Sequence, residues 1–206
     1  MKNPWEEIPL SDYENHMKLD SVFQLQTMNE MMKGQLSAYP VHSVMILGIA
    51  GGNGLIHINP QQYTKVYGVD INKAYLKEVE SRYVHLKDVL CCLAVDLLKE
   101  ANTLPQAELL IANLLIEYIG YEAFQKVVRQ VQPQVVSCII QMNEEDGWIS
   151  DSPYLRAFDN LNKIHHQMEE LPLIEALQAI GYDFIKETHQ SLPNGKKLVQ
   201  LDFAIQ

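Results

Sequence analysis

Short apolar runs alternate with helical repeats along most of this chain. The runs cover residues 41–47, 65–70, 89–95, 108–115 and 135–142, and each has the length of a buried strand. Between the second and third runs, and again between the fourth and fifth, apolar side chains recur every three or four residues, as along one face of a helix. This alternation predicts a parallel sheet with helical crossovers.

Two of the connections are too short for a full crossover helix. Residues 55–58 have room for only a short helix, because Pro60 disfavours helical geometry at Asn59. Residues 97–106 predict an abbreviated turn that ends at Pro105.

A helix precedes the first strand. Its apolar side chains repeat at helical spacing from Val22 to Leu36, and Pro40 ends the repeat. Ser21 and Gln24 are spaced as a capping box, which predicts that Ser21 is the N-cap residue of this helix.

The chain closes with one more helix and two strands. Leucines at helical spacing predict a helix that Gly181 ends. Residues 182–190 and 197–205 read as strands, and Asn194 followed by Gly195 between them is a strong hairpin signal. We therefore expect a terminal antiparallel hairpin.

The composition is that of an ordinary globular chain. Its 206 residues are 47% hydrophobic and 20% charged, so we expect one sizeable core and a single domain over residues 1–206. The 16 basic and 26 acidic residues leave a net charge of −10, which argues against a broad nucleic-acid footprint. The first residues lack the pattern of a signal peptide, and no run approaches the roughly 18 apolar residues of a membrane span. We expect a cytoplasmic protein without a membrane partner, and its oligomeric state stays open.

Metal ligands are not grouped in this sequence. Cys91, Cys92 and Cys138 lie in apolar runs without C-x-x-C spacing, which favours buried thiols over metal ligation or a disulfide framework. His165 and His166 are adjacent, so they would diverge on any helix. We therefore expect no metal site.

The first strand runs into a glycine-rich turn. Four of the seven residues 48–54 are glycines. Without Cβ atoms this backbone can take positive φ angles and let a ligand lie on its N–H groups, beside the positive end of the next helix. The turn therefore predicts nucleotide binding, although a turn that binds nothing can have the same pattern.

The glycine spacing excludes two common nucleotide motifs. A dinucleotide fingerprint needs glycines at i, i+2 and i+5, which no choice among these four supplies. A phosphate loop of the Walker type ends in Gly-Lys-Ser/Thr, whereas Leu55 and Ile56 follow Gly54.

An acidic residue closes the second strand. Asp70 lies 16 residues after Gly54, close to the roughly 20 of nucleotide-binding βαβ units. Because an ionised carboxylate has two oxygens and only accepts hydrogen bonds, Asp70 can bind both hydroxyls of a ribose. The alternative is that Asp70 or Asn72 merely caps the following helix.

The turn resembles motif I of the class I S-adenosylmethionine (SAM) dependent methyltransferases, an acid-x-Gly-x-Gly-x-Gly sequence after the first strand. Here it reads Gly48-x-Ala50-x-Gly52-x-Gly54, with Gly48 in place of the acid and Ala50 in place of the first glycine. The order of elements over residues 41–206 is also similar to this family. The resemblance implies an α/β, Rossmann-like fold with a mostly parallel seven-stranded sheet, a terminal antiparallel hairpin, helices on both faces and an N-terminal helical segment.

The same resemblance implies a set of cofactor-binding residues. They are Gly48, Ala50, Gly51, Gly52, Asn53, Gly54, Asp70, Ile71, Asp96, Leu97, Asn113 and Leu114. In the family, an acid at the position of Asp96 accepts a hydrogen bond from the adenine amino group, and the N–H of the next residue, here Leu97, reaches the ring. The cofactor would be SAM, and the product S-adenosylhomocysteine (SAH).

The end of the fourth apolar run bears on the acceptor. In methyltransferases that act on amino groups of DNA or glutamine, an Asn/Asp-Pro-Pro-Tyr/Phe sequence at this point aligns a planar nitrogen with the methyl group. This chain has Asn113, but Leu114 and Leu115 stand in place of the prolines, which weighs against that chemistry. Asn113 still ends a central strand, where open α/β sheets bind ligands.

The resemblance also indicates residues on the acceptor side. N-terminal segments of the family fold over the cofactor as a lid, so residues 1–40 would supply a lid containing Tyr13 and His16; a solvated helix start is the alternative. Either Glu117 or Tyr118 faces the substrate, or Glu117 only favours the positive N-terminus of the next helix. Tyr13, His16 and Glu117 are the candidates for a general base. The polar insertion at residues 143–160 would build the acceptor pocket or form an ordinary surface loop.

The sequence therefore predicts a SAM-dependent methyltransferase that methylates a small-molecule acceptor by direct in-line transfer. SAM already carries the methyl group on a sulfonium, so the main tasks of the protein are to align donor and acceptor and to exclude water. Two other classes stay open: an NAD(P)-dependent oxidoreductase of Rossmann type, and a SAM-binding protein without catalysis. Methylation of RNA falls within the first class, but the negative charge makes a nucleic acid the less favoured partner.

Overall fold

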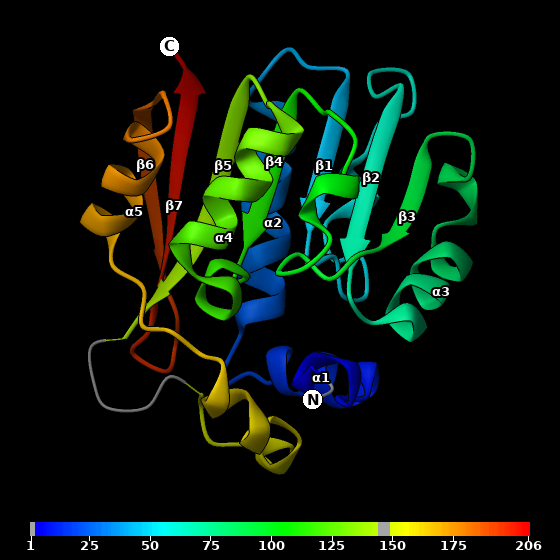
Figure 1. The fold of residues 1–206 in the computed structure, drawn as a ribbon. Coiled ribbons are helices and arrows are strands. Elements are labelled where there is room, and N and C mark those ends of the chain that lie inside the picture. Colours follow the sequence, from blue (N-terminus) through cyan, green and yellow to red (C-terminus); the bar gives the residue numbers. More distant parts are fainter. Residues whose placement is uncertain (1–2, 144–148) are drawn as a thin grey trace.

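A seven-stranded sheet organises the molecule (Figure 1). This computed structural model describes residues 3–143 and 149–206. The strands lie side by side in the order β3-β2-β1-β4-β5-β7-β6. Their bounds are β1 (Ser43–Leu47), β2 (Lys65–Asp70), β3 (Leu90–Ala94), β4 (Leu109–Asn113), β5 (Val135–Met142), β6 (Tyr182–Ser191) and β7 (Lys197–Ile205).

The first five strands are parallel to one another, and β7 alone of the seven runs in the opposite direction. Leu47 of β1 lies beside Val69 of β2 and Ala112 of β4, so β1 has a neighbour on each side. Strand β7 runs antiparallel between β5 and β6 and forms a hairpin with β6. The predicted Rossmann-like sheet with a terminal antiparallel hairpin is confirmed.

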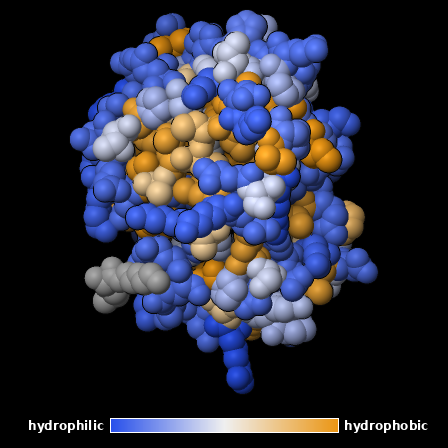
Figure 2. Space-filling view, turned by 90° about the vertical axis from the view of Figure 1, so that its right-hand side faces the viewer, coloured by the Kyte–Doolittle hydropathy of each residue, from blue (hydrophilic) through white to orange (hydrophobic). Residues whose placement is uncertain are grey.

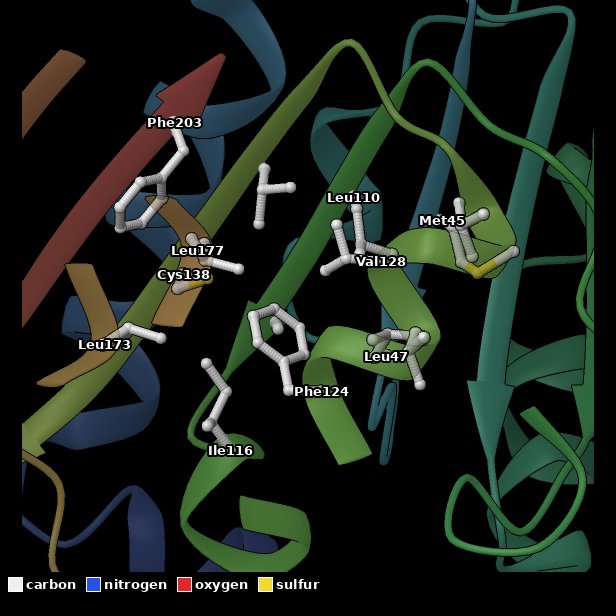
Figure 3. Packing of buried hydrophobic residues seen from close by; sticks show 14 of the residues in the cluster. Met45, Leu47, Leu110, Ile116, Phe124, Val128, Cys138, Leu173, Leu177 and Phe203 are labelled. Atoms are coloured by element: carbon white, nitrogen blue, oxygen red, sulfur yellow. The ribbon is translucent and has the colours of Figure 1, made fainter. Parts of the chain in front are cut away.

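Helices cover both faces of the sheet, as predicted. Helices α4 (Ile116–Val131) and α5 (Glu170–Gln178) pack on one face, and α2 (Gln24–Ser37) and α3 (Lys73–Arg82) pack on the other. On the first face, Phe124 of α4 lies fully buried with Leu110 and Cys138 of the sheet (Figure 3). Burial of a side chain of this size stabilises the folded state by about 1.5–3 kcal/mol, so Phe124 helps to hold α4 against the strands.

The N-terminal helix α2 covers a face that short crossovers leave open. Between β1 and β2 the only helix is a 3-10 turn at Leu55–His57, and between β3 and β4 it is another at Ala101–Thr103. Both short connections match the sequence prediction. Met32 and Leu36 of α2 instead pack on this face, and both are buried together with Ile46 of β1.

The predicted start of α2 is wrong. The helix begins at Gln24, and its N-cap residue is Phe23, in the left-handed conformation at φ 52°, rather than Ser21. Two tertiary contacts explain the difference. Val22 is buried at 1% exposure, and the Gln24 side chain donates a hydrogen bond to Gln141 of β5 at 3.1 Å, so it is turned to the sheet and not back to Ser21.

The remaining helices lie below the carboxyl ends of the parallel strands β1 to β5 (Figure 1). They are α1 (Leu10–Met17) and two 3-10 helices, Pro4–Glu6 and Leu155–Lys163; a further 3-10 turn at Val84–Leu86 follows α3. A small apolar cluster built on Ile8, Phe158 and Leu161 joins the first three. Residues 144–148 of the predicted insertion at 143–160 lie outside the described residues.

Apolar side chains gather on the side of the molecule where β3 forms an edge of the sheet (Figure 2). Four of the five residues of β3 are half-buried, and Val84 and Leu98 nearby in the chain are 63% and 55% exposed. The parallel strand β2 covers the other side of β3, so only one edge of this strand is open.

We expect Gly54→Ala to destabilise the fold far more than Gly195→Ala. Both glycines have left-handed φ angles, of 91° and 77°, but a Cβ at Gly54 would lie 2.7 Å from Met32 Sδ, whereas one at Gly195 meets nothing within 4 Å. Backbone strain costs about 1–2 kcal/mol at each site, and overpacking adds about 1–3 kcal/mol at Gly54 alone. Urea unfolding of the two variants measures the difference. Equal losses would mean that α2 does not depend on this close approach.

Candidate active site

A pocket opens at the carboxyl ends of β1, β2 and β4. It encloses about 730 Å³ of empty space, part of it open to solvent. It lies where the strand order reverses between β1 and β4, the place at which open α/β sheets bind ligands. Eight of the predicted cofactor residues line it, namely Gly48, Ala50, Asp70, Ile71, Asp96, Leu97, Asn113 and Leu114. We call it the β2 pocket.

Asp70 joins the end of β2 to the glycine-rich turn. Its Oδ2 accepts a hydrogen bond from the Ala50 N–H at 3.0 Å, and its Oδ1 accepts one from the Asn72 N–H at 2.8 Å. Burial raises the pKa of Asp70, while the hydrogen bonds from Asn72, Ala50 and Ile71 oppose that rise. Each carboxylate oxygen has a further lone pair, so Asp70 retains the capacity to accept two ligand hydroxyls.

Asn72, and not Asp70, caps the helix that follows β2. The Asn72 side chain accepts hydrogen bonds from the N–H groups of Ala74 and Tyr75, at 3.0 and 3.4 Å. The cap therefore does not use the carboxylate of Asp70, and the alternative that Asp70 only caps this helix is wrong.

Asp96 and Leu97 follow β3 and line the far side of the β2 pocket. Asp96 accepts a hydrogen bond from the Leu98 N–H at 3.0 Å and pairs with Lys99 at 2.6 Å. Lys99 is 76% exposed and Asp96 only 15%, so the ion pair lies on the solvent side of the carboxylate.

The residues of the glycine-rich turn have different surroundings. Gly48 and Ala50 line the β2 pocket with positive φ angles of 65° and 46°, so Ala50 holds a conformation that favours glycine. Gly51 and Asn53 line a narrower cavity beside it. Gly52 and Gly54 line neither cavity, since a Cβ on them would meet the side chains of Tyr83 and Met32.

The side chains of Asn53 and Asn113 are both bound to α2. Asn53 donates to the Leu25 carbonyl at 2.9 Å and accepts from Asn29 at 2.8 Å. Asn113 and the fully buried Gln35 exchange two amide hydrogen bonds, at 3.0 and 2.8 Å. Each amide keeps unused hydrogen-bonding capacity, but the helix fixes its orientation.

The N-terminal segment lies over the pocket edge. The Trp5 carbonyl accepts a hydrogen bond from Asn72 at 2.9 Å, and the Ile8 carbonyl accepts one from Tyr75 at 2.8 Å. Glu14 of α1 and Arg82 of α3 form a two-pronged ion pair above Gly51, in space that any Cβ at position 51 would occupy.

A second cavity adjoins the β2 pocket and encloses about 570 Å³, including open solvent. We call it the inner cavity. Trp5, Tyr13, Leu114 and Tyr118 line both spaces. The candidate general bases Tyr13, His16 and Glu117 all line the inner cavity. Tyr118, which was expected with Glu117 on the substrate side, also lines it. So do Trp5, His165 and Lys196, which no sequence pattern indicated for this site.

Burial shifts the pKa values of the side chains that line the inner cavity. It raises the pKa of Glu117 to about 8 and raises that of Tyr13, so the hydroxyl proton of Tyr13 stays in place at neutral pH. It lowers the pKa of Lys196 to about 8 and, together with the charges of His166 and Lys196, lowers that of His165 to about 4. His16, whose Nδ1 lies 2.8 Å from Ser152 Oγ, also has a lowered pKa, from burial and the Lys196 charge.

Within residues 3–143 and 149–206, no group of three or more metal-ligating side chains is gathered in one place. Among the helices formed by those residues, none has the length and apolar character needed to cross a membrane.

The sequence matches no family model and no curated protein. Solved structures match its fold. Magnesium protoporphyrin IX methyltransferase (ChlM) from Synechocystis PCC 6803, with bound SAH, aligns at a TM-score of 0.68 and 13% identity over 91% of this chain and 86% of its own. The N-methyltransferase NodS from Bradyrhizobium japonicum WM9, in complex with SAH, aligns at 0.67 and 12% over 95% and 97%.

The [4+2]-cyclase SpnF aligns as well, at a TM-score of 0.65 and 10% identity over 87% of this chain and 80% of its own. At these identities the likeness concerns the fold. The chain has the fold of the SAM-dependent methyltransferases, and that fold also serves a cyclase.

We expect Glu117→Gln to change how stability depends on pH. Because burial raises the pKa of Glu117 from 4.5 to about 8, the folded state keeps a proton in that interval that the unfolded state has lost. The free energy of unfolding of the wild type should therefore fall relative to the variant, by up to roughly 1.4 kcal/mol per pH unit, as the pH rises through this window. Urea titrations at several pH values measure it.

The difference between wild type and variant at each pH is the relevant quantity. His16 and His165 have lowered pKa values and destabilise the folded state as the pH falls, which is the opposite direction, but they do so in both proteins. A difference that does not vary with pH would contradict an uncompensated buried acid at Glu117.

Proposed function

We propose that this protein is a SAM-dependent methyltransferase that acts on a small-molecule acceptor. The observation that carries the proposal is the β2 pocket. In it, Asp70 stands at the end of β2, next to Gly48 and Ala50 with their left-handed backbone, and its carboxylate can still accept hydrogen bonds from a ligand. A carboxylate at this position of a nucleotide-binding βαβ unit accepts from ribose hydroxyls. Fold neighbours with bound SAH support the choice of cofactor.

Each side of the β2 pocket would hold one part of SAM. Asp70 would accept hydrogen bonds from the two ribose hydroxyls, and Asp96 one from the adenine amino group. Ile71 and Leu97 also line the pocket and would supply apolar contact for the adenine ring. SAM brings the methyl group on a sulfonium, so the protein need not activate the donor.

The inner cavity would hold the acceptor. It meets the β2 pocket at Tyr13 and Leu114, so a ligand there would lie next to the bound cofactor. Holding the two reactants in contact can lower the barrier by about 7–11 kcal/mol, and the N-terminal segment would keep water out during transfer. The small volume of the inner cavity and the net charge of −10 support a small molecule over a nucleic acid.

The two other function classes make different predictions. An NAD(P)-dependent oxidoreductase has no support among the neighbours named above, and it would bind NAD or NADP. A [4+2]-cyclase among the neighbours means that this fold is not confined to methyltransferases, and the third class, a SAM-binding protein without catalysis, stays open. Transfer of labelled methyl from SAM to any acceptor would exclude that third class.

Asp70→Asn should weaken binding of SAM and SAH at least about tenfold, the roughly 1.4 kcal/mol of a lost charged hydrogen bond. Asp88→Asn removes the same charge from an exposed position outside the β2 pocket and should bind like the wild type. Calorimetric titration measures both, with NAD as the control ligand. Binding of NAD without SAM would establish the oxidoreductase, and equal loss in both variants would contradict the role of Asp70.

Glu14→Gln should loosen the N-terminal segment and weaken SAH binding. It removes half of the ion pair that connects α1 to α3 above Gly51. Glu78→Gln is the matched control, because Glu78 pairs with Arg82 at 2.9 Å without involving α1. Hydrogen exchange of residues 10–17, with and without SAH, is the measurement. We expect faster exchange in Glu14→Gln alone and slower exchange in the wild type on SAH binding. An unchanged rate in α1 would argue against a lid.

A further inference from the structure

Glu117 is a buried acid with an incomplete set of hydrogen bonds. It is 5% exposed at the start of α4, and within the described residues its Oε2 has no hydrogen-bond partner. Buried polar atoms are nearly always paired, so an exception inside a cavity points to a group that arrives from outside.

Aromatic rings gather next to this acid in the inner cavity. Trp5 packs edge-on against Tyr118, with ring centroids 5.0 Å apart, and against Tyr13, with centroids 5.8 Å apart. All three side chains line the inner cavity together with Glu117. Aromatic faces attract cations, most strongly where water is excluded.

The charges of the inner cavity divide into two ends. Burial, with a smaller contribution from Glu117, raises the pKa values of Tyr13, Tyr118 and Cys138, so these neighbours on α1, α4 and β5 carry no charge at neutral pH. At the other end, burial and, to a smaller extent, the charge of Lys196 lower the pKa values of His16 and His165. No ion pair formed between described residues includes Glu117.

We propose that the inner cavity takes an acceptor with a basic amine, whose nitrogen binds Glu117 and lies against the rings of Trp5, Tyr13 and Tyr118. The inference rests on the proposed function and adds the class of acceptor. An ammonium group would supply both the hydrogen-bond donor that Oε2 lacks and the cation that the rings attract. A methyl acceptor that carries a carboxylate would instead lie against the carboxyl group of Glu117, an unfavourable pairing of two acids.

A basic amine also agrees with the residues that follow β4. The Asn-Pro-Pro-Tyr pattern serves planar, non-basic nitrogens, and its prolines are absent here. A basic amine has a free lone pair once one proton leaves. Such an acceptor therefore needs a proton acceptor more than it needs an aligned planar site.

The transfer step balances with Glu117 as the proton acceptor. An ammonium binds to the ionised carboxylate, after the resting proton of Glu117 has gone to solvent. One N–H proton then moves to the carboxylate, which leaves a neutral amine. The nitrogen lone pair forms the N–C bond as the C–S bond breaks, and that electron pair stays on sulfur. The products are SAH and a methylated ammonium, and one proton is released overall.

The test uses three probes of similar shape and different charge. Benzylamine, benzyl alcohol and benzoate are titrated by calorimetry into the wild-type protein saturated with SAH, at pH 7 and in two buffers of different ionisation enthalpy. We expect benzylammonium to bind at least about tenfold more tightly than either other probe. Because Glu117, with a pKa of about 8, must ionise on binding, close to one proton should be released per benzylammonium.

Glu117→Gln should abolish both the preference and the proton release. Glu122→Gln removes an acid from the exposed side of the same helix and should keep both. The comparison of probes on the wild type stands even if the variant fails to fold.

The outcomes separate the two proposals. If SAH does not bind, the proposed function fails and the inference falls with it. If SAH binds but the probes bind equally, benzoate binds best, or none binds up to about 10 mM, the inference alone is overturned. Amine binding that survives Glu117→Gln would also overturn it.

Discussion

Close approach to a backbone without Cβ atoms is the constraint on which this site depends. Three helical segments reach the glycine-rich turn at successive positions. Glu14 of α1 occupies the space above Gly51, Tyr83 at the end of α3 lies against Gly52, and Met32 of α2 lies against Gly54. The same turn receives Asp70 through the Ala50 N–H. The turn, the covering N-terminal segment and the wall of the β2 pocket are therefore parts of one packing arrangement.

The two acids of the site have opposite surroundings. Backbone N–H groups of Ala50, Ile71 and Asn72 oppose the effect of burial on Asp70. Glu117 is more deeply buried than Asp70, and the backbone group that lowers its pKa is its own. A carboxylate that accepts several backbone hydrogen bonds stays ionised and is suited to a fixed contact with hydroxyl groups. A buried carboxyl group without such donors is suited to taking up and releasing a proton. Tyr13 lines both cavities, and Asp70 and Glu117 both add to the rise that burial causes in its pKa.

The fold by itself does not select the chemistry. Proteins with 10–13% identity to this chain share its sheet, and they include methyltransferases and a cyclase. In this chain, the site is shaped by the segments that cover the sheet and its carboxyl edge. Short crossovers leave a face to α2, and Gln35 of that helix holds Asn113 in place through two amide hydrogen bonds. The N-terminal residues then add aromatic side chains to the inner cavity.

The sequence by itself determined the sheet and the place of the β2 pocket. Periodicity and turn residues are local signals, so β2 and β5 have the bounds that the apolar runs predict, and Asp70 ends β2 as expected. Only the tertiary structure decided which side chains meet. The start of α2 moved to Gln24 because its side chain reaches Gln141, far away in the chain. The inner cavity joins Trp5, Glu117 and Lys196, and its pKa shifts arise from burial, which no local pattern encodes.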